Sequence, residues 1–225
     1  KVLDSNIEFF TEFIGRDYPR IGLEDCDENP LVMLSYYNDL ENCLWSKSQA
    51  FEELQYSLRS LSMKQDRLFF NSVIAALRDK AANTFIGFWE KTIKNQILPT
   101  NAKIVGIAIT FQDQIIPAYT LADQIRQIAP DLKIVMGGQM ITRCYSSMLE
   151  HKEIMEYADY LVLWDGEIPI LNIHDRIYKG SKGDFTNVID TNEKGHKINR
   201  NGAYTKGHNI PSPDFTDLDF SAYAF

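Results

Sequence analysis

Three short runs of apolar residues alternate with segments of helical periodicity in the second half of this chain of 225 residues. Each run is rich in β-branched residues and too short for a helix, which is typical of strands covered on both faces in a parallel sheet. Short connections between alternating strands and helices favour right-handed crossovers and a sheet layered between helices. The runs are AKIVGIAIT at residues 102–110, LKIVM at 132–136 and DYLVL at 159–163.

The segments that follow the three runs have apolar residues at the spacing of one helix face. Residues 142–158 follow the second run and residues 167–180 the third, where Pro169 is tolerated because it lies in the first turn. We therefore predict an α/β fold, Rossmann-like or flavodoxin-like, with a parallel sheet and flanking helices. The face predicted for the helix after the first run consists of Ala118, Leu121, Ala122, Ile125 and Ile128.

The remaining segments differ from this alternation. Residues 1–16 predict a short strand followed by a helix, and a later hairpin is predicted to turn near residues 192–195 before a Pro- and Asp-rich linker. Between them lies a long segment with a single glycine and no proline after its first residue, which predicts two or three amphipathic helices. The predicted domains are an α/β domain of residues 1–29 and 99–183, a helical insertion at 30–98, and a hairpin and linker at 184–225.

The helical insertion has two interpretations. Its helices either pack as structure, or they cover the sheet or contact a substrate peptide. Periodicity does not show whether their aromatic residues are core or an exposed binding groove. We favour packing and interpret the aromatic residues of the insertion as core. These residues are Tyr36, Tyr37, Trp45, Phe69, Phe70, Phe85, Phe88 and Trp89.

Composition excludes several classes of protein. The net charge is −8, with 23 Lys and Arg scattered among 31 Asp and Glu, so a nucleic-acid backbone finds no basic patch. No apolar run approaches the ~18 residues that a membrane span requires. Cys26, Cys43 and Cys144 lie far apart, which argues against a disulfide framework or a Cys-rich metal site and favours a reducing, cytoplasmic location.

Ligands of open parallel sheets bind beyond the carboxyl ends of the strands, so the loops after the three runs form the candidate site. These loops contain TFQDQ at 110–114, GGQM at 137–140 and WDGEIP at 164–169. Gly137 and Gly138 lack a Cβ, so a ligand can approach the main chain and its N–H groups. Polar or glycine-bearing loops after three successive strands indicate a broad ligand platform at one edge of the sheet.

Each loop also has a purely structural explanation. A glycine pair after a strand can make a tight turn. In the third loop, Gly166 can be a turn before a helix, with Asp165 as its N-cap and Glu167 favoured by the helix dipole. Thr110 and Gln112 are open to a similar explanation. The residues alone leave these alternatives open.

At these loops the chain resembles the N-terminal cobalamin-binding domain of cobalamin-dependent radical SAM enzymes, most closely the branch that matures ribosomally made peptides. In that branch a comparable Pro-Asp-Phe linker leads into the radical SAM barrel. Residues 1–15 resemble the second strand and helix of the domain, so its first strand is expected before Lys1. The resemblance covers roughly residues 100–225 and is carried by VGIAITFQDQIIPAYTLADQIRQIAPDLKIVMGGQ, ADYLVLWDGEIPIL and IPSPDFTDLDFSAYAF.

The resemblance implies a base-off cobalamin across the strand edge, with its nucleotide tail entering the α/β domain. It implies a parent radical SAM enzyme whose corrinoid is positioned for methyl transfer or related radical chemistry, while a [4Fe-4S] cluster and S-adenosylmethionine belong to a domain after Phe225. The expected partners are the corrinoid, that radical SAM domain and a substrate peptide; no residue of this chain is expected to be catalytic or to bind metal. The residues that match the contacting loops are Thr110, Phe111, Gln112, Gln114, Gly137, Gly138, Gln139, Asp165, Gly166 and Glu167.

The chain departs from this family at identifiable positions. Trp164 and Asp165 precede Gly166 where the third loop of the family usually reads Gly-Glu-Gly-Glu, and Ala108 stands where Ser is common. The Asp-x-His-x-x-Gly signature of mutase-type cobalamin domains is absent, so a His-ligated cobalt is not predicted. The histidines are instead expected on the surface or in loops: His151, His174, His196 and His208.

Other functions compete with this one. The main alternative is a non-catalytic domain with a degenerate Rossmann-like fold that recognises a peptide or partner through its helices. A phosphoacceptor receiver domain needs an acceptor Asp after the middle strand and a Lys after the last, whereas Gly137 and Trp164 occupy strand ends here. MGGQM is not Gly-x-Gly-x-x-Gly and no Walker-type Gly-Lys-Ser/Thr occurs, so neither nicotinamide nor ATP is implied.

Overall fold

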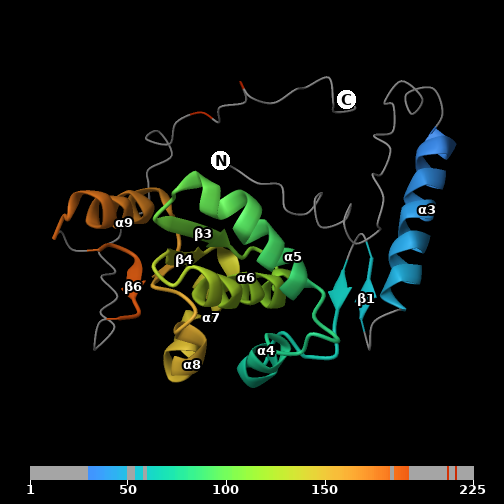
Figure 1. The fold of residues 1–225 in the computed structure, drawn as a ribbon, viewed down its shortest axis with the longest axis horizontal. Helices are drawn as coiled ribbons and strands as arrows, with labels where there is room; N and C mark the ends of the chain where they lie inside the picture. Colours follow the sequence, from blue (N-terminus) through green and yellow to red (C-terminus); the bar gives the residue numbers. More distant parts are fainter. Residues whose placement is uncertain are drawn as a thin grey trace. The chain divides into compact units, whose positions relative to one another are not determined.

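A computed structural model of the chain gives the elements drawn in Figure 1. The strand and helix predicted at residues 1–16 lie outside the part of the chain that the structure describes. The same holds for the hairpin turn predicted after Asn192 and for nearly all of the predicted linker. The described residues are 30–49, 54–57, 60–182 and 185–192, with Ser212 and Thr216.

Two compact units make up the chain. One comprises Lys1–Lys64 with Pro211–Phe225, and the other comprises Gln65–Ile210. The boundary after Lys64 lies inside residues 30–98, which the sequence predicted as a single insertion. The second part of that segment therefore belongs to the same unit as the sheet.

The first unit contains a helix and a two-stranded antiparallel hairpin. Ser48, at the end of the helix, is buried and joins the two. Its hydroxyl donates to the Leu44 carbonyl at 2.8 Å and accepts the Tyr56 N–H at 3.0 Å. The elements are α3 (Pro30–Ser48), β1 (Gln55–Tyr56) and β2 (Leu61–Ser62).

A hairpin that includes Leu61, with Leu54 directly before its first strand, lies within the segment that the sequence predicted to form amphipathic helices. Both leucines are buried, so the apolar pattern marks core positions correctly, but Leu61 belongs to a strand. The turn is made by Ser57, whose N–H donates to the Ser60 carbonyl and whose hydroxyl accepts the Ser60 N–H, both at 3.0 Å. Hydroxyl groups that bond to nearby backbone compete with helix formation, which apolar spacing does not reveal.

The second unit is built on a sheet of the order β3-β4-β5-β6. β3, β4 and β5 are parallel, whereas β6 runs antiparallel to β5. The predicted α/β class is confirmed, but the sheet is mixed, because the first strand of the predicted C-terminal hairpin adds to its edge (Figure 1). The strands are β3 (Ile104–Ala108), β4 (Lys133–Gly137), β5 (Tyr160–Val162) and β6 (Val188–Asp190).

Helices connect the strands of the second unit and also precede them. The Trp89 indole N–H donates to the Pro117 carbonyl at 2.9 Å, and the buried Asn83 side chain donates to the Thr120 hydroxyl at 2.8 Å, so α5 packs on α6. No helix of the described residues is long and apolar enough to cross a membrane. The elements are α4 (Phe70–Ala76), α5 (Phe85–Thr92), the π-helix η1 (Ile93–Ile97), the 3₁₀ helices η2 (Leu98–Thr100) and η3 (Gln112–Gln114), α6 (Ile115–Ile128), α7 (Gln139–Glu150), α8 (Lys152–Met155) and α9 (Glu167–Lys179).

The predicted aromatic core of residues 30–98 is only partly correct. Tyr37, Trp45 and Phe69 are exposed by 54%, 56% and 66%. Phe88 and Trp89 of α5 are buried, as is Phe85. The difference follows from packing: α5 contacts α6, which gives its apolar face a partner, whereas periodicity cannot tell which apolar faces have one.

α9 covers part of one face of the sheet. Its Ile173 is 1% exposed and packs with side chains of β4, β5 and β6, and Ile104 and Ile177 lie beside them. Because side chains alternate along each strand, the residues between these point to the opposite face. The cluster under α9 contains Val135, Tyr160, Val162, Ile173 and Val188.

β3 is less covered than the sequence predicted. Ile107 is buried on one face, but Gly106 and Ala108, which alternate with it, are exposed on the other. The prediction of a strand covered on both faces is wrong here, because the cluster under α9 is centred on β4, β5 and β6. We call the exposed pair Gly106 and Ala108 the β3 strip.

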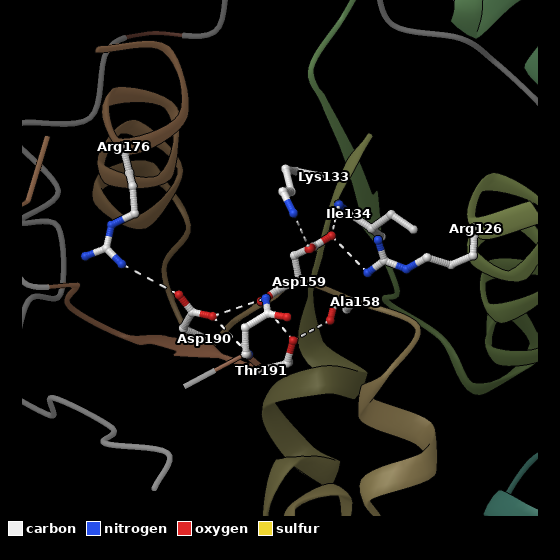
Figure 2. A network of polar contacts seen from close by, with 9 residues as sticks. Arg126, Lys133, Ile134, Ala158, Asp159, Arg176, Asp190 and Thr191 are labelled. Atoms are coloured by element: carbon white, nitrogen blue, oxygen red, sulfur yellow. Dashed lines mark hydrogen bonds and ion pairs between the residues drawn. The ribbon is translucent and has the colours of Figure 1, made fainter. Parts of the chain in front are cut away.

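A charged network around Asp159 holds the amino edge of the sheet (Figure 2). This carboxylate, 5% exposed, forms ion pairs with Lys133 at 3.0 Å and Arg126 at 2.9 Å. The carboxylate also accepts the Ile134 N–H at 2.9 Å. The backbone carbonyl of Asp159 accepts the Thr191 N–H, just after β6, at 3.0 Å. Burial alone would raise the pKa of Asp159, but the Ile134 hydrogen bond and the two cations outweigh it and hold the pKa below its usual value.

Candidate functional site

The three predicted loops meet at the carboxyl edge of the sheet, because β3, β4 and β5 are parallel neighbours. The first two loops are hydrogen-bonded to each other. Ile109 donates its N–H to the Gly137 carbonyl at 2.9 Å and accepts the Met140 N–H at 3.0 Å. The loops after β3 and β4 therefore form one continuous piece of backbone structure.

Gly138 is required by the protein's own backbone. Its φ is +97°, and a Cβ at this position would lie 2.6 Å from the carbonyl oxygen of Ile109. Gly137 differs, because a Cβ there would make an ordinary contact of 3.4 Å with Val162. The tight-turn explanation therefore accounts for Gly138. At Gly137, neither a positive φ nor a steric clash requires a glycine.

The first loop is capped by its own glutamine. The side-chain oxygen of Gln114 accepts the N–H groups of Thr110 at 2.8 Å and Phe111 at 3.0 Å. These two donors are therefore engaged within the loop. Phe111 is 67% exposed, and Gln112 is exposed beside it. Asp113 pairs with Arg67 at 3.0 Å, which holds the segment before α4 next to this loop.

The third loop lies beside the second. A Cβ added at Gly137 and a Cβ added at Gly166 would each lie 3.9 Å from the same Val162 methyl group. The N-cap of α9 is Gly166, so the sequence-based assignment of Asp165 as N-cap is wrong. Glu167 opens the helix and is exposed, as is Gln139 at the start of α7.

Trp164 lies two residues after β5 and has a left-handed conformation with φ of +59°. This conformation costs a bulky residue about 1–2 kcal/mol, and it persists only where neighbouring groups fix it. The backbone N–H of Trp164 donates to the Thr142 hydroxyl at 2.9 Å. The Trp164 ring meets the Tyr145 ring edge to face at 6.1 Å. Both partners lie on α7, the helix that follows the glycine pair.

Sequence reasoning missed the part played by Thr142. Its N–H donates to the Gly138 carbonyl at 3.1 Å while its hydroxyl accepts the Trp164 N–H. The first turn of α7 thus links all three loops, since Met140 of the same turn reaches Ile109. No sequence signal marks Thr142, whereas a tryptophan directly before Asp-Gly could have signalled an unusual turn.

The β3 strip opens beside the flank of α9. A Cβ at Gly106 would meet no atom within 4 Å. The Tyr178 hydroxyl accepts the Lys103 N–H at 3.0 Å, which places one side of α9 along β3. Helical spacing puts Leu171 and His174 on the same side, where Leu171 is 64% exposed and the His174 ring stacks on Tyr178 at 4.7 Å. An exposed part of the strand face, which carries only a glycine and an alanine, therefore lies beside an apolar and aromatic flank of α9.

Comparisons with known proteins give no match: no protein-family model, curated protein or solved structure matches the chain significantly. Within the described ranges, no group of three or more His, Cys, Asp or Glu residues could hold a metal ion. Function is therefore inferred from the geometry of the carboxyl edge.

Proposed function

We propose that this chain is the cobalamin-binding N-terminal domain of a cobalamin-dependent radical SAM enzyme, with a Rossmann-like α/β fold. It would position the corrinoid for methyl transfer or related radical chemistry that is carried out with a further C-terminal domain. That domain would supply the [4Fe-4S] cluster and bind S-adenosylmethionine. The chain by itself would bind the cofactor without performing the reaction.

The observation that carries this proposal is the junction of three parallel strand ends through one helix turn. Met140 and Thr142 of α7 bond to the first and third loops, so the carboxyl edge is a fixed surface. A flat macrocycle needs such a broad edge, whereas a small anion needs a single loop. Phe111 and Leu171, each more than 60% exposed, add apolar surface.

The β3 strip fits the second requirement of a corrinoid, a slot for its nucleotide tail. Gly106 and Ala108 leave the strand face bare, and Leu171, His174 and Tyr178 flank it. Bound cobalamin would supply cobalt-centred group transfer. Of the protein groups, Gln112 and Gln139 are exposed polar side chains at the edge, and Gly137 and Gly166 are half-buried there.

Filling the β3 strip tests the proposal. Gly106→Val places a β-branched residue in open space on a strand, so the fold should retain its Tm while the slot is blocked. We expect the wild-type protein to retain hydroxocobalamin through desalting, seen in its visible spectrum, and the variant to lose it. The matched control is Gly87→Ala, at an exposed glycine of α5 with equally open space. A folded wild-type protein that retains no corrinoid would contradict the proposal.

Peptide recognition is a second candidate, favoured by an apolar surface near the first loop. Leu68 and Phe69 are 62% and 66% exposed, and the Arg67–Asp113 ion pair holds them near Phe111. Exposed apolar side chains that gather on one surface often mark binding sites. Titration with substrate-like peptides, followed by fluorescence anisotropy, should then show binding that Leu68→Ser with Phe69→Ser abolishes and that needs no corrinoid.

A further inference from the structure

We propose that Trp164 is a ligand-positioning residue of the carboxyl edge and that Thr142 holds it in place for that role. The inference rests on the proposed corrinoid site. It adds two residues to that site. Trp164 would contact the ligand, and Thr142 would act by holding Trp164.

The fold does not call for a tryptophan at this position. Glycine adopts a positive φ without strain, and the residue that turns the chain from β5 towards α9 has φ of +59°. The indole is only half-buried, whereas Val162 and Leu163 before it are 3% and 0% exposed. Neither the backbone conformation nor the core therefore calls for an indole at this position.

Two contacts hold Trp164. The Thr142 hydroxyl accepts its backbone N–H at 2.9 Å, and the Tyr145 ring meets the indole at 6.1 Å. Thr142 belongs to the helix turn that also bonds to Gly138, so the backbone of Trp164 is fixed relative to the second loop as well as the third, and Tyr145 of the same helix contacts its indole. A flat aromatic group fixed at the border of two loops gives a conjugated ligand a surface for stacking or edge contact.

The position explains a departure from the resembled family. Where that family usually reads Gly-Glu-Gly-Glu, this chain has Trp164 and Asp165 before Gly166 and Glu167. Replacing a small residue by an indole narrows the edge at this loop. We therefore infer that Trp164 limits where a flat ligand sits and how it is oriented.

The experiment compares four variants in hydroxocobalamin titrations followed by visible absorbance, with Tm measured for each. Trp164→Gly should keep the Tm at or above that of the wild type and weaken binding about fivefold to tenfold, the size of one aromatic contact. Trp164→Phe should recover most of the affinity. Thr142→Val should weaken binding, whereas Thr142→Ser, which keeps the hydroxyl, should bind as the wild type does.

A double variant tests whether Thr142 acts through Trp164. Thr142→Val removes the acceptor of a backbone N–H that glycine at position 164 also carries, so it should lower the Tm in both backgrounds, but it should lower the affinity only when Trp164 is present. Trp45→Ala, which removes an exposed indole from α3, is the control and should leave the dissociation constant unchanged.

The outcomes separate this inference from the proposed function. Wild-type affinity in Trp164→Gly would overturn the ligand role of Trp164 while leaving the corrinoid site intact. A folded wild-type protein without corrinoid affinity would overturn the proposed function together with that ligand role. Equal losses of affinity from Thr142→Val with and without Trp164 would overturn the role of Thr142 in holding Trp164 for the ligand.

Discussion

The two edges of the same sheet are built in opposite ways. At the amino edge, the buried carboxylate of Asp159 is surrounded by two cations and by backbone donors (Figure 2). At the carboxyl edge, the described contacts between loops are backbone bonds and one threonine hydroxyl, and three residues, Gly138, Trp164 and Asn187, have positive φ. At the amino edge, charged side chains pair with the buried carboxylate. At the carboxyl edge, backbone hydrogen bonds join the loops, and some residues adopt a strained conformation.

This difference indicates that the amino edge contributes mainly to the stability of the unit and the carboxyl edge mainly to ligand binding. Strain and exposed apolar groups persist at sites that bind ligands, and the rest of the fold compensates for them. Asp159 and Thr191 join β4, β5 and β6 at the amino edge, so they fix the strands from which the open edge projects. Changes at the amino edge should lower stability, and most changes at the carboxyl edge should alter binding.

The largest effect is expected at Asp159. Asp159→Ala removes the acceptor of the Ile134 N–H and leaves Lys133 and Arg126 without their shared partner. We expect a loss of about 3–4 kcal/mol in the free energy of unfolding, measured by urea titration with far-UV circular dichroism. Asp175→Ala is the control, because its pairs with Lys179 and His174 are exposed and contribute little. Equal losses in the two variants would refute the contrast between the edges.

Gly138→Ala is the carboxyl-edge change that should act through stability. Its Cβ would meet the Ile109 backbone at 2.6 Å, and its φ of +97° disfavours any side chain. We expect a loss of about 2–3 kcal/mol in the same urea titration. At Gly106, by contrast, Ala meets open space and should change the free energy of unfolding by less than about 1 kcal/mol. If both variants unfold alike, the backbone contact at Gly138 does not constrain the edge.

Acid should weaken the amino edge of the sheet. The folded-state pKa of Asp159 lies below its usual value of about 3.9, so its contribution is complete above that pH and is lost as the pH falls through the folded-state pKa. Asp159→Asn should therefore be less stable than the wild type at neutral pH, and the difference should shrink in acid. Urea titrations at several pH values check this, and a constant difference would show that the charge of Asp159 does not stabilise the fold.

The sequence predicted the elements whose signal is local. The runs around Ile107, Ile134 and Leu161 became strands because β-branched apolar residues at these lengths favour buried extended chain. The meeting of the three loops followed from parallel order alone. In contrast, the exposure of Gly106 depends on where α9 lies across the sheet, which the pattern of either segment does not contain.

Side-chain bonds between elements were beyond prediction for the same reason. Thr142 reads as an ordinary helix residue, and its bond to Trp164 exists only because α7 and β5 pack side by side. The pairing of β6 with β5 was likewise hidden, since the residues around Val188 carry a strand signal but no partner signal. The local sequence pattern therefore predicted the strands of the sheet. The contacts at its open edge depend on tertiary packing, which the local pattern does not contain.

The smallest effect is expected from the cap of the first loop. Gln114→Ala removes the oxygen that accepts the N–H groups of Thr110 and Phe111, both exposed, so water can replace it. We expect about 1 kcal/mol in urea titration, as for loss of a helix cap, together with faster amide exchange at these two residues. Gln112→Ala, at an exposed neighbour, is the matched control and should change neither quantity. Unchanged exchange in Gln114→Ala would mean that the first loop holds its shape without this cap, and the carboxyl edge would then be fixed by α7 alone.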